Sequence, residues 1–275
     1  GSDYGIATIW DADILIYLSS VVTAMKNSGR NEIPRAIDVT VYDLLRSIGR
    51  PTGGSAYKRL ESTLDRLVST VVKTNVRTEG SRESTFSWLD SWSKTVDKED
   101  RVIGLRLEMS NWFYQSLMPA NSVLTIDRSY FELTGGLERW MYRVARKHAG
   151  GHGKRGFSMR FKTLYEKAGV QDRYTKFKTR LLAIVEANAL PGIDLKVEGS
   201  TRIPDPMLRM TVVKSVKPKS EGEGTDDDIP RVGYNEKNDG KVVKHPSASQ
   251  FIEPKTDPSE PDELADPGQV LRLLR

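Results

Sequence analysis

Two stretches of this sequence place cations and hydroxyl groups at helical spacing on one side and apolar residues on the other. The second stretch lies 117 residues after the first, as Tyr174 does after Tyr57. The polar sides carry, in the first and then the second stretch, Arg59, Ser62 and Thr63, and Lys176, Thr179 and Arg180. Guanidinium and ammonium groups donate to guanine edges or to phosphate, and hydroxyls suit either contact. The chemistry that this pattern predicts is hydrogen bonding to DNA.

The apolar sides of the two stretches match as well. Their residues pair as Tyr57 with Tyr174, Leu60 with Phe177, Leu64 with Leu181, Leu67 with Ile184, Val68 with Val185 and Val71 with Asn188. Within residues 41–79 and 161–203 the expected order is short helix, turn, long amphipathic helix and two strands. This is the order that a winged helix needs in order to contact a DNA groove. One such helix alone is common in α+β proteins, so the prediction depends on the repetition.

Each pair of strands is predicted to form a wing that follows its long helix. The first wing, over residues 71–77 and 85–92, has three cations at or near its tip, namely Lys73, Arg77 and Arg82. The second wing, over residues 193–197 and 207–213, has Arg202 in its loop. Wing cations would lie along the adjacent DNA backbone or in the minor groove. We expect the two units to bind successive turns of one duplex, with their centres about 34 Å apart.

A glycine-rich basic loop precedes the second copy. It contains Lys147, His148, His152, Lys154 and Arg155. Glycines would let this loop follow a phosphate backbone, and a solvated loop without a ligand is an equally open interpretation. The loop is not a Walker A motif, because His148 stands where the first glycine is required and Arg155 follows Lys154.

Other chemistry has little support in the sequence. The glycines between His148 and His152 keep the two imidazoles from sharing a helix face, and no carboxylate is near enough in sequence to complete a metal site. Asp11 and Asp13 are expected to cap a helix rather than to act as a carboxylate pair. The tryptophans at 88, 92, 112 and 140 have apolar neighbours and are expected in the core or at a domain interface. We therefore expect a protein that is not an enzyme and has no catalytic residue, metal or cofactor. A nuclease or primase stays open as an alternative that metal-dependent nicking would support.

The remaining pattern divides the chain into two winged-helix domains, over residues 3–120 and 121–215, and a tail over residues 216–275. In the first domain we expect a first helix that is capped by Asp11 or Asp13 and runs to about residue 26. Further helices are expected at 42–48, 55–70 (with Ser55 as cap) and 111–117, and further strands at 36–40 and 102–109. In the second we expect strands at 123–126 and 157–161 and helices at 130–148, 163–168 and 172–189. The fold class is α+β.

Composition supports this division. The formal charge is +5 for the chain, which combines +9 over residues 1–215 with −4 over the tail. A basic body favours a polyanionic partner. The acidic tail holds seven of the 13 prolines and is expected to be disordered, apart from apolar spacing at 270–274. Cysteine is absent and no apolar run is long enough to span a bilayer, which favours the cytoplasm.

Several long strings resemble the plasmid replication initiator protein A family of proteobacteria. They are IWDADILI at 9–16, YDLLR at 42–46, TGG at 52–54, YKRL at 57–60, TNVR at 74–77, YFELTGGLERW at 130–140 and RKHAG at 146–150. The resemblance spans about residues 4–200 and does not extend to the tail.

The resemblance implies an initiator that binds repeated sites (iterons) in double-stranded origin DNA and helps to open adjacent AT-rich DNA. It also implies a homodimer in equilibrium with a monomer, autorepression, and contacts with the host initiator and replicative helicase. The second domain would be the main DNA reader, and the first would also serve dimerisation. DNA contact is carried over to Arg173, Lys176, Thr179 and Arg180, and to Lys58, Arg59, Ser62 and Arg66. A winged-helix transcriptional repressor without a direct role in replication is the alternative.

Overall fold

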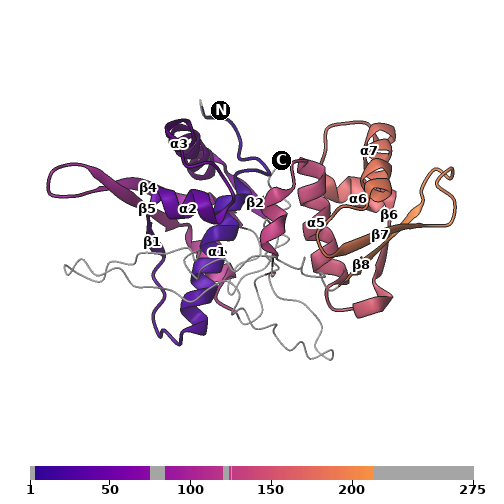
Figure 1. The fold of residues 1–275 in the computed structure, drawn as a ribbon, viewed down its shortest axis with the longest axis horizontal. Helices are drawn as coiled ribbons and strands as arrows, with labels where there is room; N and C mark the ends of the chain where they lie inside the picture. The colour runs from indigo at the N-terminus through magenta and orange to yellow at the C-terminus, as the bar shows by residue number, and fades with distance from the viewer. Residues whose placement is uncertain (1–3, 75–83, 120–123, 125, 214–275) are drawn as a thin grey trace, which may run out of the picture. The chain divides into compact units, whose positions relative to one another are not determined.

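The computed structural model describes residues 4–74, 84–119, 124 and 126–213. The chain forms two compact units that divide between Val123 and Leu124 (Figure 1). This division lies three residues from the boundary predicted after residue 120. The predicted tail, residues 216–275, lies outside the described residues.

The first unit contains a three-stranded antiparallel sheet covered by helices. Its sheet has the order β1-β5-β4, and a separate short pair is formed by β2 and β3. The elements are α1 (Ala12–Asn27), β1 (Ala36–Val39), α2 (Val41–Ser47), α3 (Gly54–Ser69), β2 (Val72–Thr74), β3 (Ser84–Phe86), β4 (Leu89–Val96), β5 (Val102–Met109) and α4 (Asn111–Ser116). At the end of α1, Lys26 Nζ donates to the carbonyls of Leu117 and Met118 at 3.0 and 2.9 Å, which ties α1 to the end of the unit.

The second unit is built on a sheet of the order β6-β8-β7, also antiparallel. Its elements are the 3₁₀ helix η1 (Arg128–Glu132), α5 (Gly136–Ala149), the 3₁₀ helix η2 (Gly153–Arg155), β6 (Phe157–Arg160), α6 (Phe161–Ala168), α7 (Tyr174–Ala187), β7 (Ile193–Glu198) and β8 (Met207–Val212).

The two units repeat one arrangement. In each, a strand leads into a short helix, a long helix and a hairpin, and the last strand of the hairpin lies in the middle of the sheet, as β1-α2-α3-β4-β5 and β6-α6-α7-β7-β8 show. The repeat predicted from the long helices therefore extends to the order of the strands. The first unit differs by the additional pair β2–β3 between its long helix and its hairpin.

The hairpin predicted for the first wing is confirmed in part, because β2 pairs with β3 as expected, but the run at 85–92 does not form one strand. It is split into β3 and β4 by Ser87 and Trp88. The indole of Trp88 is fully buried, its backbone N–H donates to the Leu67 carbonyl and its carbonyl accepts from Ser110. Burying this large side chain turns the backbone out of the first pair. The hairpin that joins the main sheet is thus β4–β5, which projects from the first unit (Figure 1).

Two predicted helix caps and one predicted helix start are also wrong. The Asp11 side chain makes no capping hydrogen bond at the start of α1 and, like that of Asp13, it forms a buried ion pair instead. Helix α3 begins at Gly54 with Gly53 at the cap position, so Ser55 lies inside its first turn. In the second unit, α7 begins at Tyr174 rather than at 172.

The opening of the second unit differs from the prediction. Leu124 and Ile126, which are the described residues of the predicted strand at 123–126, are not in a strand. The helix predicted over 130–148 is divided into η1 and α5. The first segment ends at Glu132, and α5 begins after Gly135, whose N–H donates to the Glu138 carboxylate at 3.0 Å.

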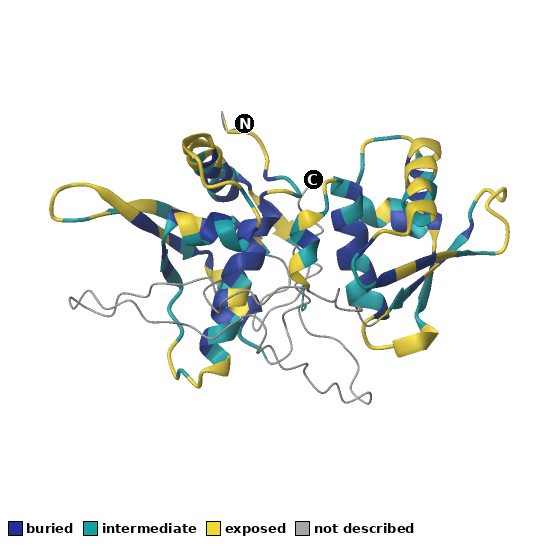
Figure 2. Cartoon of the chain, in the orientation of Figure 1, coloured by how far each residue is buried: buried dark blue, intermediate teal, exposed yellow. Residues whose placement is uncertain are grey.

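Both long helices bury the central part of the apolar side that the sequence predicted, whereas Val71 lies beyond the end of α3 and is 69% exposed. Helix α3 buries Leu60, Leu64 and Leu67, and α7 buries Phe177 and Leu181. Each such side chain contributes about 1.5–3 kcal/mol when it leaves water. Tyr57, assigned to the apolar side of α3, is 39% exposed. The outer sides of both helices are exposed (Figure 2).

Among the described residues, no helix has the length and apolar character needed to cross a membrane.

Candidate nucleic-acid interface

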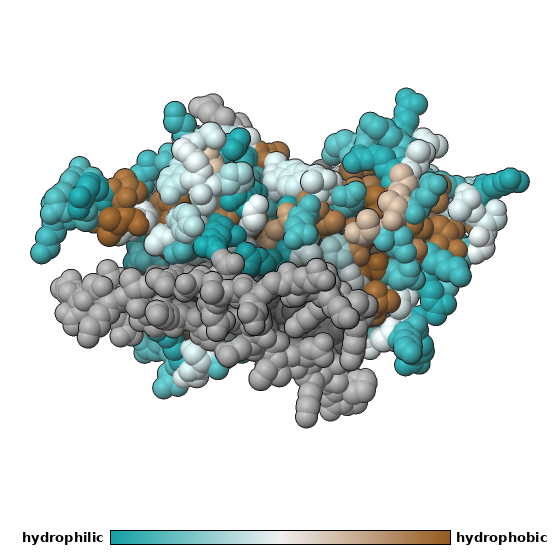
Figure 3. Space-filling model, viewed as in Figure 1, coloured by the Kyte–Doolittle hydropathy of each residue, from teal (hydrophilic) through white to brown (hydrophobic). Residues whose placement is uncertain are grey.

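The solvent-facing side of α7 carries a basic face that we define as Arg173, Lys176, Thr179 and Arg180. All four side chains are exposed, whereas Phe177 between them is buried. The surface over this part of the second unit is hydrophilic (Figure 3). The structure thus brings together the four residues predicted for the second long helix and separates them from its apolar side.

Asp172 lies immediately before the basic face and was not among the predicted residues. Its carboxylate accepts from Lys176 Nζ at 2.8 Å and from Arg180 Nη1 at 3.1 Å. The hydrogen bond from Lys176 is the main cause that holds the pKa of Asp172 below its ordinary value. The spacing of four residues to Lys176 is the sequence signal that identifies such a pair on a helix.

The loop between β7 and β8, residues 199–206, is fastened to α7. Lys178 Nζ donates to the Ile203 carbonyl at 2.6 Å, and the Tyr174 hydroxyl donates to the Pro204 carbonyl at 2.9 Å. Arg202 in this loop is exposed, and its N–H donates to the Ser200 hydroxyl at 3.2 Å. The hairpin predicted for the second wing therefore forms, and the helix with the basic face fixes the loop that carries Arg202.

The basic loop is held against the sheet by an arginine. Lys154 and Arg155 lie in η2 with exposed side chains, and the Arg155 carbonyl accepts from Arg209 Nε at 3.0 Å. The rings of His148 and His152 stack on Phe157, with centroid separations of 5.3 and 5.8 Å. This packing gives both imidazoles a structural role and places the two cations on the surface.

In the first unit, only part of the predicted polar side of α3 faces solvent. Lys58, Arg59 and Ser62 are exposed. Thr63 is 2% exposed, and its hydroxyl accepts from Arg66 Nη2 at 3.1 Å. Thr63 is therefore withdrawn from the predicted contact surface, since a buried hydroxyl cannot reach a groove.

Arg66 is also committed to the protein interior. Its Nε and Nη2 donate to the two carboxylate oxygens of Asp11 at 2.9 and 2.7 Å, while the backbone N–H of Thr8 donates to the same carboxylate at 2.8 Å. Burial raises the pKa of Asp11, but the hydrogen bonds from Arg66 and Thr8 outweigh burial and leave the pKa below its ordinary value. This bidentate pair joins α1 to α3 and uses the donors that DNA contact would need.

Lys73, one of the cations predicted for the first wing, lies on the β2–β3 pair rather than on the hairpin of the main sheet. Lys73 is exposed on β2, while Arg77 and Arg82 lie outside the described residues. The turn between β4 and β5 is instead mixed in charge, because Asp97, Glu99 and Asp100 accompany Lys98 and Arg101.

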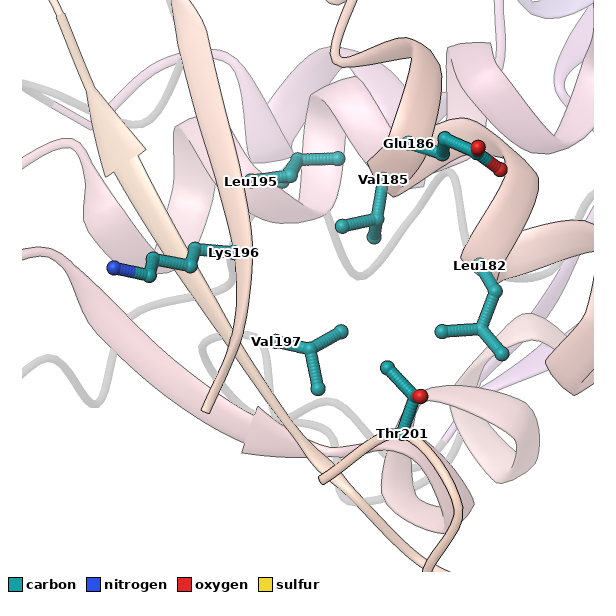
Figure 4. Close-up of a pocket in the computed structure, with 7 residues that line it drawn as sticks. All are labelled: Leu182, Val185, Glu186, Leu195, Lys196, Val197 and Thr201. Carbon is teal, nitrogen blue, oxygen red and sulfur yellow. The ribbon is translucent and has the colours of Figure 1, made fainter. Parts of the chain in front are cut away.

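A hollow of about 450 Å³ lies between the end of α7 and β7 (Figure 4). The side chains of Leu182, Val185 and Val197 point into it, whereas Lys196 points away. Because the lining is mainly aliphatic, the hollow lacks the group of donors that a phosphate ligand needs.

Within the part of the chain that the structure describes, no group of three or more His, Asp or Glu side chains is placed to hold a metal ion. The described charged residues of the interface are mostly cations on exposed helix and loop positions.

Comparison with known proteins assigns the family. The family description "Replication initiator protein A" matches residues 1–195. A protein of Wigglesworthia glossinidia brevipalpis, named "Putative replication protein", is 32% identical over 196 residues, which cover 70% of each chain. A crystal structure of domains 2 and 3 of RctB has a TM-score of 0.54 at 16% identity, and the match covers 75% of this chain and 83% of that one. That likeness supports the α+β fold alone, whereas the sequence matches show that this chain belongs to the replication initiator protein A family.

Proposed function

We propose that this protein initiates plasmid replication by binding double-stranded DNA sequence-specifically at repeated sites in the origin, with each unit acting as a winged helix. Family membership supports the role in replication initiation. The repeated order of strand, short helix, long helix and hairpin supports the winged-helix assignment. The observation that carries the proposal is the basic face of α7, which stands opposite a buried apolar side.

In this proposal α7 enters the major groove, which is about 12 Å wide and admits a helix. Lys176 and Arg180 donate to guanine O6 and N7, while Thr179 contacts a base edge or a phosphate. Arg202 lies along the adjacent backbone, because the loop that carries it is fastened to α7. Lys154 and Arg155 add phosphate contacts from the basic loop.

The first unit contributes a smaller set of contacts through Lys58, Arg59 and Ser62, which are the exposed members of its long helix. No covalent step is needed. Binding energy from many phosphate contacts bends the duplex and makes an adjacent AT-rich segment easier to open. The protein acts without a metal or cofactor, and it recruits the host initiator and the replicative helicase. A dimer in equilibrium with the monomer represses the initiator's own gene.

The test is binding of the full chain to a duplex that contains the repeats beside its own gene, measured by fluorescence anisotropy against a scrambled duplex of equal composition. Replacing both Lys176 and Arg180 by alanine removes two base contacts of about 1–3 kcal/mol each. We expect the cognate affinity to fall by roughly thirtyfold or more, since about 1.4 kcal/mol corresponds to a factor of ten.

The matched control replaces Lys94 and Arg106, two exposed cations of the β4–β5 hairpin, by alanine. Each is paired on the protein surface, with Glu61 and Asp38 respectively. This variant removes the same charge and should leave discrimination between the two duplexes intact. An unchanged cognate affinity in the Lys176/Arg180 variant would refute the assignment of α7. If a plasmid with this origin replicated in cells that lack the protein, the role in replication would be refuted and only the repressor function would remain.

A further inference from the structure

An acidic side chain lies at the N-terminal end of the cationic row of α7. Lys176 and Arg180 are four residues apart on one side of the helix, and Asp172, which lies two residues before the first residue of α7, binds both of them. The Asp172 side chain is 29% exposed, whereas those of Lys176 and Arg180 are 65% and 49% exposed. Both cations therefore reach out from a carboxylate that lies deeper than they do.

The position of Asp172 is fixed by the rest of the unit. The Tyr165 hydroxyl of α6 donates to the Asp172 backbone carbonyl at 2.8 Å. The ring of Tyr165 in turn packs against Phe177, with centroids 5.4 Å apart. The backbone of Asp172 is thus anchored to the core, while its carboxylate is bound by Lys176 and Arg180.

We infer that Asp172 is a specificity-determining residue that disfavours DNA lacking the cognate sequence, an inference that rests on the proposed function. A phosphate that approaches Lys176 or Arg180 also approaches the carboxylate bound to both. A guanine edge is uncharged, so the same cations can contact it without bringing a second anion to Asp172. The carboxylate therefore penalises phosphate contacts more than base contacts.

The donor inventory permits both contacts at once. Lysine has three N–H donors and arginine has five, so a hydrogen bond to Asp172 leaves others for DNA. Non-specific binding comes essentially from phosphate contacts, whereas specific binding adds base edges. Asp172 consequently lowers the first kind of affinity more than the second, and it orders the two cations before DNA arrives.

The experiment replaces Asp172 by asparagine, which keeps the shape and removes the charge. Binding of the full chain is measured at several salt concentrations on the repeat duplex and on the scrambled duplex. Removing one negative charge about 4 Å from a phosphate in water should raise the binding affinity about fivefold. We expect the Asp172→Asn variant to bind the scrambled duplex about fivefold more tightly, with a smaller change on the repeat duplex. For the scrambled duplex, the salt slope should steepen by about 0.9 for each additional phosphate that the variant neutralises.

Glu166→Gln is the matched control, because it removes one exposed negative charge from α6. It should leave the ratio of the two affinities unchanged. The inference would be overturned if Asp172→Asn raised the affinity for both duplexes equally or lowered it for both. It would also be overturned if Glu166→Gln caused the same loss of discrimination. Wild-type protein that fails to distinguish the two duplexes would instead overturn the proposed function, and the inference with it.

Discussion

The buried pair between Asp11 and Arg66 should carry much of the stability of the first unit. The Asp11 side chain is 1% exposed and that of Arg66 is 24% exposed. Asp11→Asn keeps the volume of the side chain, so the change creates no cavity, but it removes the charge that two Arg66 donors meet. Breaking a buried pair costs about 3–5 kcal/mol. Since water reaches part of Arg66, we expect a loss near the lower limit, about 3 kcal/mol.

Urea titration followed by tryptophan fluorescence is a suitable assay, because four of the five tryptophans (10, 88, 92 and 112) lie in the first unit. Glu61→Gln is the control on the same helix. Its pair with Lys94 is exposed, with side chains 41% and 45% exposed, and such pairs contribute about 0–1 kcal/mol. Equal losses in the two variants would refute the argument that burial makes the Asp11 pair important.

The pH dependence gives a second criterion. Hydrogen bonds that outweigh burial leave the pKa of Asp11 below its value in the unfolded chain, which is about 3.9. The ionised carboxylate therefore contributes stability above that pH, and the contribution is lost as the pH falls through the folded-state pKa. The difference between wild type and Asp11→Asn should shrink below about pH 4. Adding Arg66→Met to Asp11→Asn should restore part of the stability, because it removes the unpaired charge.

Two further substitutions test the assignments of Gly156 and Thr63. Gly156 has φ of 63°, and a Cβ there would lie 2.4 Å from the Met210 carbonyl oxygen, so Gly156→Ala should lower the stability of the second unit by roughly 3 kcal/mol. Gly151→Ala, at a position with no atom within 4 Å of the added Cβ, should have little effect in the same urea titration, and equal effects would contradict the close approach. Thr63→Val should leave DNA affinity unchanged and lower stability by about 1 kcal/mol, because Thr63 accepts a hydrogen bond inside the unit. A loss of affinity at unchanged stability would contradict its burial.

Helical periodicity predicted the long helices well because each buries one continuous apolar side. Leu60, Leu64 and Leu67 repeat at the spacing of a helix face, and they are all buried. Thr63 lies three residues after Leu60 and four before Leu67, so its position already placed it on the buried side. Thr63 was predicted to contact DNA because its side chain has a hydroxyl group, and its position on the helix was not taken into account.

Contacts between distant parts of the chain could not be predicted from local pattern. Arg66 and its partner Asp11 are 55 residues apart. Without that partner, Arg66 resembles any exposed cation on a helix, and Asp11 resembles a helix cap. The first hairpin was predicted only in part for a related reason, since neither strand alternation nor the expected burial of Trp88 shows that its backbone contacts with Leu67 and Ser110 divide the strand.

The two units share an order of elements but differ in the charges that they present to solvent. In the second unit, Asp172 is the carboxylate paired with the basic face, and Lys176 and Arg180 extend from it into solvent. In the first, the guanidinium of Arg66 is held inside by Asp11, and the hairpin turn carries more acids than bases. Because phosphate contact requires exposed cations, the second unit should supply the larger share of the affinity and of its salt dependence. The first unit therefore presents less net positive charge to solvent than the second. A second protein chain would meet less electrostatic repulsion there.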